Sequence, residues 1–235
     1  MNKKYISHSG NEVLISHFPG KSRIKHHDLM YEFSKRSFHI PDNIDIISVI
    51  TQDILNDAVL HIQLSRNNIE YINPAKGRFF IWSMDKKIPL ILQSLLLSKK
   101  EYCLILDGLD AVIISDLDNI FERFMTYGKK VLFNATIWKF PEILIDTVVN
   151  RDQYGKYNHF NAGCCFGKTK DLIDFYKYCN EVFENDLTVT DNEQYYLRRA
   201  FDKRQDDVFF DYDCRIFQVW HGVNERVEGS NVYLT

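Results

Sequence analysis

The sequence predicts an α/β domain in which helices cover a parallel or mixed β-sheet. Segments typical of strands and of amphipathic helices alternate along most of the chain, which is the pattern of folds with a helix-covered sheet. One predicted strand, at 101–106, is short and almost entirely apolar, as expected at the centre of such a sheet. The 235 residues, of which 45% are hydrophobic, suit one domain with a sizeable core.

Each element is predicted from residue type, periodicity and boundary residues. The first strand, Ile44 to Thr51, is rich in β-branched residues and follows Pro41-Asp42-Asn43. Pro89 is tolerated in a helix because it falls in the first turn. The other expected elements are, in order, a helix at 53–66, a strand at 69–72, a helix from 85 or 86 to 98, the strand at 101–106, a helix at 117–127, strands at 130–134 and 160–166, helices at 171–183 and 192–201, and a strand at 208–211.

The first 40 residues are polar and only weakly periodic. We expect them to form an N-terminal extension, residues 1–40, outside a main domain that spans residues 41–235. A short helix is predicted around His27 to Lys35. No chemistry is assigned to this segment.

Charge and cysteine content exclude several classes of protein. A formal net charge of −3 does not suggest a nucleic-acid partner, which would call for a basic excess. The five cysteines form no Cys-x-x-Cys pair, so we expect buried, reduced thiols rather than disulfides or a zinc site. Neither an apolar signal core nor a transmembrane run is present, which predicts a cytoplasmic protein and leaves a viral or bacterial origin open. The sequence does not reveal the oligomeric state.

The most informative motif is an acidic turn directly after the apolar strand. Asp107 and Asp110 flank Gly108, which permits a tight backbone path. Ligands of open α/β sheets bind beyond the carboxyl ends of the strands, where these carboxylates lie. Two carboxylates at this spacing can share a divalent cation that bridges a diphosphate. The alternative is a helix cap or a solvated loop, but apolar runs on both sides make uncompensated burial costly.

The turn is followed, in register, by three further motifs. The four segments are Leu106-Asp107-Gly108-Leu109-Asp110-Ala111-Val112; Lys130 to Ala135 with Pro141-Glu142; Phe160 to Gly163 with Phe166-Gly167; and Asp191 to Tyr196 with Asp211 and Arg215-Ile216-Phe217-Gln218. Together they resemble the glycosyltransferase domain of procollagen lysyl hydroxylases over roughly Ile44 to Thr235. The resemblance implies a single GT-A (Rossmann-like) domain with a mixed, mainly parallel sheet flanked by helices.

That resemblance also implies an enzyme, a hexosyltransferase that moves glucose or galactose from a UDP-sugar to a hydroxyl of a glycan or protein. Mn²⁺, or Mg²⁺, would be held by Asp107 and Asp110. Some of the implied residues have another interpretation. Asp191 and Glu193 could be acids in the first turn of a helix, Trp82 could pack in the core, and Trp138 and Phe140 could anchor a loop. The implied sets are Asp191, Glu193 and Gln194 for catalysis; Val49, Ile50, Thr51, Trp82, Lys86, Leu109, Asn161, Ala162 and Gly163 for the nucleotide-sugar; and Trp138 and Phe140 on the acceptor side.

Two departures from the family pattern leave other functions open. The histidine that is the third metal ligand of the family would fall beyond Thr235, so either the sequence is shortened before it, or water, substrate phosphates or His221 complete the site. Thr136 stands where the family has an acid. A non-catalytic nucleotide-sugar-binding or scaffold module with a degenerate metal site is therefore the alternative. A metal-dependent phosphohydrolase using Asp107 is a third hypothesis.

Overall fold

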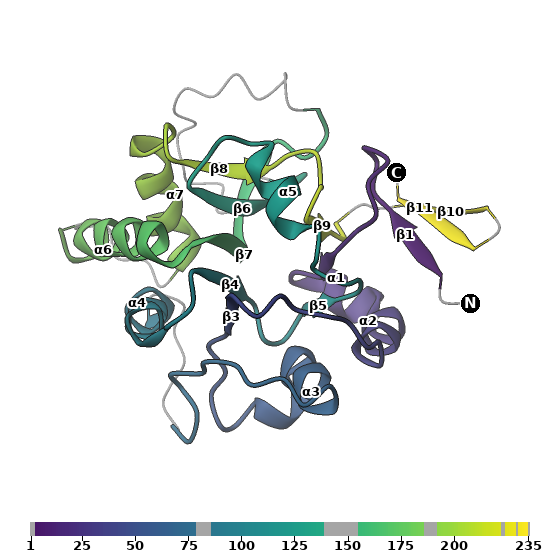
Figure 1. Cartoon of the computed structure of the whole chain (residues 1–235), viewed down its shortest axis with the longest axis horizontal. Coiled ribbons are helices and arrows are strands. Elements are labelled where there is room, and N and C mark those ends of the chain that lie inside the picture. Colours follow the sequence, from purple (N-terminus) through teal and green to yellow (C-terminus); the bar gives the residue numbers. More distant parts are fainter. Residues whose placement is uncertain are drawn as a thin grey trace.

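The computed structural model describes residues 3–78, 86–138, 155–185, 192–221, 224–228 and 230–234. At its centre is a five-stranded sheet of order β3-β4-β7-β6-β8 (Figure 1). β3 is parallel to β4 and β6 is parallel to β8, whereas β7 is antiparallel to both of its neighbours. The predicted mixed α/β sheet is confirmed, with parallel and antiparallel pairings in equal share. The strands are β3 (Ile44–Ile47), β4 (Tyr102–Leu106), β6 (Val131–Thr136), β7 (His159–Lys168) and β8 (Val208–Asp211).

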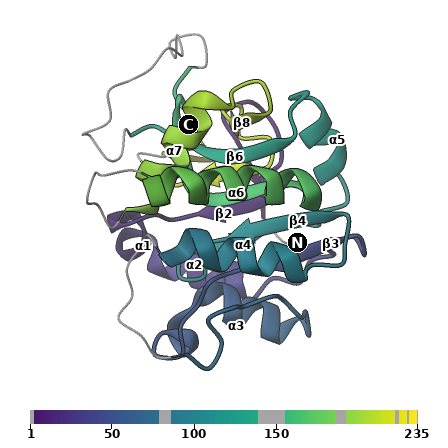
Figure 2. The same ribbon diagram turned by 90° about the vertical axis from the view of Figure 1, so that its left-hand side faces the viewer.

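Helices cover both faces of this sheet because successive strand residues point to opposite sides. On β4, Cys103 and Ile105 pack into one apolar cluster, and Leu104 and Leu106 pack into another. Helices α4, α6 and α7 cover the first face, with α4 and α6 in contact along their length (Figure 2). Helices α3 and α5 cover the second. Their bounds are α3 (Val59–Arg66), α4 (Lys87–Leu97), α5 (Ile120–Met125), α6 (Thr169–Asn185) and α7 (Glu193–Lys203).

The first 40 residues pack into the same body as the rest of the chain. β2 lies in the middle of a second sheet, antiparallel to β5 and parallel to β9, and all three of its residues are buried. β1 pairs with β11, whose other neighbour is β10. The helix predicted near residue 27 is present as α2. These elements are β1 (Lys4–Ile6), β2 (Ile15–His17), α1 (Lys21–Lys25), α2 (His27–Ser34), β5 (Ala111–Ile113), β9 (Phe217–Val219), β10 (Glu225–Glu228) and β11 (Asn231–Leu234).

Several predicted elements are shorter than expected; the strand predicted at Ile44 to Thr51, for example, ends at Ile47. The helix predicted at 53–66 begins with a separate 3-10 turn at Leu55–Asp57, before α3. The strand predicted at 69–72 is reduced to a single bridge between Ile72 and Ile47. Just after this bridge, the Asn73 side chain accepts from the Ile50 N–H at 3.1 Å and donates to the Ile50 carbonyl at 2.8 Å. All five cysteines are buried and unpaired, as predicted. Among the described residues, no helix has the length and apolar character that crossing a bilayer requires.

Candidate metal centre

The acidic turn connects β4 to β5 at the carboxyl end of β4. The Asp107 N–H donates to the Gly163 carbonyl at 2.8 Å, and the Ala111 N–H donates to the Asp107 carbonyl at 3.2 Å, so the turn is closed on itself and bound to β7. A Cβ atom at residue 108 would overlap the Ile50 side chain, which explains the glycine between the two acids. The turn thus holds both carboxylates at the carboxyl ends of the strands. The Asp107 side chain is 28% exposed and the Asp110 side chain is 15% exposed.

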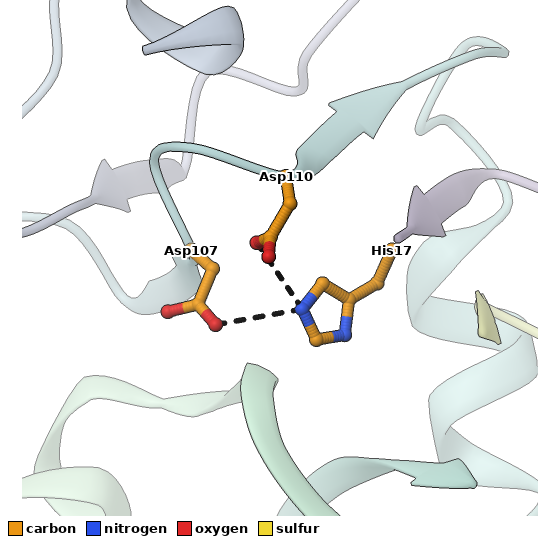
Figure 3. Close-up of side chains that lie close together, drawn as sticks. All are labelled: His17, Asp107 and Asp110. Carbon is orange, nitrogen blue, oxygen red and sulfur yellow. Dashed lines mark ion pairs between the residues drawn. The ribbon is translucent and has the colours of Figure 1, made fainter. Parts of the chain in front are cut away.

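A histidine from the first 40 residues lies against both carboxylates. The Nε2 atom of His17, on β2, is 3.4 Å from Oδ2 of Asp107 and 3.3 Å from Oδ1 of Asp110 (Figure 3). One ligand atom from each of the three residues lies within 4.8 Å of the other two. Nε2 is buried, and no described residue satisfies it with a well-aligned hydrogen bond. A nitrogen and two carboxylates therefore converge on one point.

Backbone and side-chain contacts fix His17 in this place. The Phe18 N–H donates to the Asp110 carbonyl at 2.8 Å, and the Trp220 N–H donates to the His17 carbonyl at 2.9 Å. The Asn134 side-chain amide lies 3.0 Å from Nδ1 of the ring. On the remaining side, a Cβ atom at residue 163 would overlap the ring, so Gly163 provides the space that the imidazole occupies. Sequence reasoning missed His17, although the apolar run Val13-Leu14-Ile15 before it is a short strand signal.

The charges at this site are strongly coupled. Burial acts to lower the pKa of His17, but Asp110 and Asp107 outweigh it and raise the pKa to about 9. Burial acts in the opposite direction on Asp107, yet Lys87 and His17 lower its pKa to about 2. Without a bound cation, these pKa values favour a charged His17 imidazole beside a charged Asp107 carboxylate.

Lys87, at the start of α4, connects Asp107 to Glu193 at the start of α7. Its Nζ pairs with Oδ1 of Asp107 and lies 3.3 Å from Oε1 of Glu193. Burial would lower the pKa of Lys87, but the two carboxylates outweigh it and raise the pKa. Burial raises the pKa of Glu193, and Lys87 offsets only part of that effect. The second Glu193 oxygen, Oε2, is buried and has no hydrogen-bond partner within the described part of the chain.

These side chains border a cavity of about 390 Å³, here called the central cavity. Its wall combines charged and apolar side chains. The described lining residues are Gly20, Arg23, Val49, Ile50, Thr51, Asp53, Ile54, Lys87, Asp107, Gly108, Leu109, Asp110 and Glu193. Val49, Ile50, Thr51 and Leu109, expected beside the nucleotide, are therefore in the wall together with both aspartates and Glu193. Lys86 is not, because its neighbour Lys87 is the lysine that reaches the cavity.

Several other expected site residues brace the backbone instead of lining the central cavity. Oε1 of Gln194 accepts from the Ala162 N–H at 3.1 Å, and Oδ1 of Asn161 accepts from the Gly163 N–H at 2.9 Å. These bonds hold β7 beside the acidic turn. Nε2 of His221 lies 2.9 Å from the Pro19 carbonyl oxygen, so this histidine is engaged away from the aspartates.

The expected acceptor side is only partly covered by the structure. Trp138 is 60% exposed and does not line the central cavity. Trp82, Phe140 and Asp191 lie outside the described residues. Asn192, next to Asp191, caps α7 by accepting from the Gln194 N–H at 3.0 Å. Among the implied catalytic residues, Glu193 is the one that the structure places in the cavity wall.

Comparison with known proteins identifies the family. A family described as the PLOD GT domain matches residues 85–231. No curated protein matches the chain. Among solved structures, a glucose-1-phosphate thymidylyltransferase from Bacillus anthracis in complex with a sucrose is similar at 13% identity and a TM-score of 0.38, over 71% of this chain and 67% of that one. A 4-diphosphocytidyl-2C-methyl-D-erythritol synthase from Anaerococcus prevotii is similar at 18% identity and a TM-score of 0.39, over 71% and 68%. The family match spans well over half of the sequence, and the chain belongs to the PLOD GT domain family, the glycosyltransferase domains of procollagen lysyl hydroxylases.

Proposed function

We propose that this protein is a metal-dependent hexosyltransferase that moves glucose or galactose from a UDP-sugar to a hydroxyl group of a glycan or protein. The observation that carries the proposal is the convergence of His17, Asp107 and Asp110 beside the central cavity of a glycosyltransferase-family chain. Nucleotide-sugar transfer requires charge compensation on the departing diphosphate, and this is the place in the described structure where a cation would provide it.

The residues fit a divalent cation such as Mn²⁺, or Mg²⁺ in its place. The 3.3 and 3.4 Å separations of the donor atoms match the spacing of about 3 Å between neighbouring ligands that each lie roughly 2.0–2.2 Å from a cation. The buried Nε2 atom of His17 has no other well-aligned partner in the described chain. When bound, the cation would supply Lewis-acid stabilisation of the leaving nucleoside diphosphate.

The other residues of the cavity have distinct proposed roles. Val49, Ile50 and Leu109 form an apolar wall suited to the nucleoside. Lys87 holds Asp107 and Glu193 in fixed positions through its two ion pairs. Glu193 offers Oε2, which has no hydrogen-bond partner among the described residues, to a sugar hydroxyl or to positive charge that develops at the anomeric carbon. The non-catalytic alternative rests on a missing third metal ligand. His17 is a candidate for that ligand, which argues against the alternative.

The decisive experiment measures UDP release from UDP-glucose and UDP-galactose in the presence of Mn²⁺, with water as the acceptor. Wild-type protein is expected to release UDP from one donor, and calorimetry is expected to show UDP binding that requires Mn²⁺. His17→Ala and Asp107→Ala should lose both, whereas His221→Gln, which removes a histidine bound to Pro19, should retain them. Wild-type protein without Mn²⁺-dependent UDP binding would overturn the proposal.

A further inference from the structure

Helix α1 brings a cationic side chain, Arg23, to the wall of the central cavity. Arg23 is half-buried and lies six residues after His17, in the segment that precedes the matched family region. Its guanidinium makes no hydrogen bond, ion pair or ring contact with any described residue. Lys87, the other cation of the described wall, is already held by two carboxylates. Of these two cations, Arg23 is therefore the one whose charged group can contact a ligand.

The backbone that carries Arg23 is fixed to the metal centre. The Phe18 N–H bonds to the Asp110 carbonyl, and the buried Ser22 hydroxyl donates to the Trp220 carbonyl at 2.9 Å. The first turn of α1 is closed by the Arg23 N–H, which donates to the Gly20 carbonyl at 3.2 Å. The start of the side chain thus has a defined position relative to His17 and the acidic turn.

Arg23 lines a second cavity as well as the central one. A neighbouring cavity of about 810 Å³ shares Arg23, Ile54 and Leu109 with the central one. Lys87, Asp107 and Glu193 line only the central cavity. Arg23 therefore lies in the part of the wall that the two cavities share, together with the apolar side chains of Ile54 and Leu109.

We propose that Arg23 binds the nucleobase of the donor, with its guanidinium plane stacked on the base. This inference rests on the proposed function, in which the donor is a nucleotide-sugar. A guanidinium is planar and weakly hydrated and stacks on aromatic faces, which an ammonium does not do. No aromatic ring is present among the described residues that line the central cavity. Arg23 provides the flat cationic surface, and Leu109 provides apolar contact beside it.

The test distinguishes the effect of a planar side chain at residue 23 from the effect of its positive charge. UDP and inorganic pyrophosphate are titrated, each with Mn²⁺, into wild-type protein, Arg23→Lys, Arg23→Phe and Arg23→Ala. The Lys and Ala variants are expected to lose about tenfold in UDP affinity, the scale of one base-stacking contact. Arg23→Phe should retain most of the affinity, and pyrophosphate binding should change less than twofold in all variants. Lys25→Ala is the matched control. Lys25 is an exposed, positively charged residue on the same helix, and it does not line the central cavity.

Other outcomes overturn the inference. If Arg23→Lys binds UDP like wild type while Arg23→Phe and Arg23→Ala lose pyrophosphate, Arg23 pairs with phosphate and not with the base. If every variant binds UDP like wild type, Arg23 has no role in donor binding. Both results leave the proposed function intact, whereas failure of the wild-type protein to bind UDP with Mn²⁺ contradicts the proposed function itself.

Discussion

Gly163 and His17 lie so close across the metal centre that a side chain on residue 163 would overlap the imidazole. A Cβ atom there would stand 2.6 Å from Nε2 of His17 and 2.8 Å from Oδ2 of Asp107. The glycine on β7 therefore determines how near a histidine from β2 can come to the acidic turn. The close approach of three separate segments depends on the absence of one methyl group.

Gly163→Ala is expected to displace His17 and weaken Mn²⁺ binding at least about tenfold, comparable to the loss of a supporting contact around a metal ligand. Mn²⁺ affinity is measured by electron paramagnetic resonance titration, and stability by thermal unfolding. Gly167→Ala is the matched control on the same strand, because its Cβ would meet the Lys130 carbonyl at 2.7 Å, away from the aspartates. Both variants should lose stability through overpacking. Equal Mn²⁺ affinity in the two variants would contradict the role of Gly163.

The amide of Asn134 contacts the His17 nitrogen that faces away from the aspartates. Its Nδ2 faces Nδ1 of the ring at 3.0 Å, while its Oδ1 accepts from the Cys164 N–H at 3.2 Å. In this orientation a neutral ring carries its proton on Nε2, towards the aspartates. A cation on Nε2 requires the proton on Nδ1, with an oxygen to accept it.

Asn134→Asp supplies that oxygen while it keeps an acceptor for the Cys164 N–H. We expect Mn²⁺ affinity to rise about tenfold, because a carboxylate behind a histidine ligand fixes the productive tautomer. The metal-free protein should become less stable, since the new carboxylate is fully buried near two others. Calorimetric titration of Mn²⁺ and thermal unfolding with a chelator measure the two effects. Unchanged or weaker Mn²⁺ binding would show that His17 does not bind the cation through Nε2.

Replacement of Lys87 tests the charge balance between α4 and α7. Lys87→Met leaves Asp107 and Glu193 without their shared cation and should cost about 3 kcal/mol of unfolding free energy in metal-free protein. Mn²⁺ should restore part of that loss by compensating Asp107. Denaturant unfolding with and without MnCl₂ measures both quantities, and Lys86→Met, which alters the adjacent lysine outside the cavity wall, is the control. A loss of equal size with and without Mn²⁺ would argue against cation binding beside Asp107.

The prediction for Asp211 concerns stability rather than chemistry. This buried carboxylate accepts backbone N–H groups of Arg215, Ile216 and Phe217 at 2.7–2.8 Å and also the Tyr127 hydroxyl. Asp211→Asn turns an amide N–H₂ towards these donors and should reduce the unfolding free energy by about 2 kcal/mol. Asp213→Asn, in the same turn, removes a partly exposed ion pair with Arg215 and should cost less than about 1 kcal/mol. Urea denaturation distinguishes them, and similar losses would contradict this account.

The acidic turn could be predicted from sequence because strand, turn and strand are local features of one short segment. His17 could not, since its place depends on the pairing of β2 with β5 and β9, which are distant in sequence. The sequence predicted Lys86 beside the nucleotide, whereas the next residue, Lys87, lines the cavity. A shift of one position turns a helical side chain by about 100°, so Lys86 and Lys87 point in different directions, and the start of α4 decides which one reaches Asp107. Periodicity alone does not fix a helix boundary that finely.

The interleaving of β2 between β5 and β9 affects how the protein can be made. On the ribosome β2 emerges first and β9 last, so the early strand must wait for its parallel partner until residue 219 has been synthesised. A fragment cut to the matched region, 85–231, would keep both aspartates but leave β5 and β9 without the strand between them, which exposes edges prone to aggregation. Cation binding at this centre would thus show that β2, which carries His17, has joined the acidic turn.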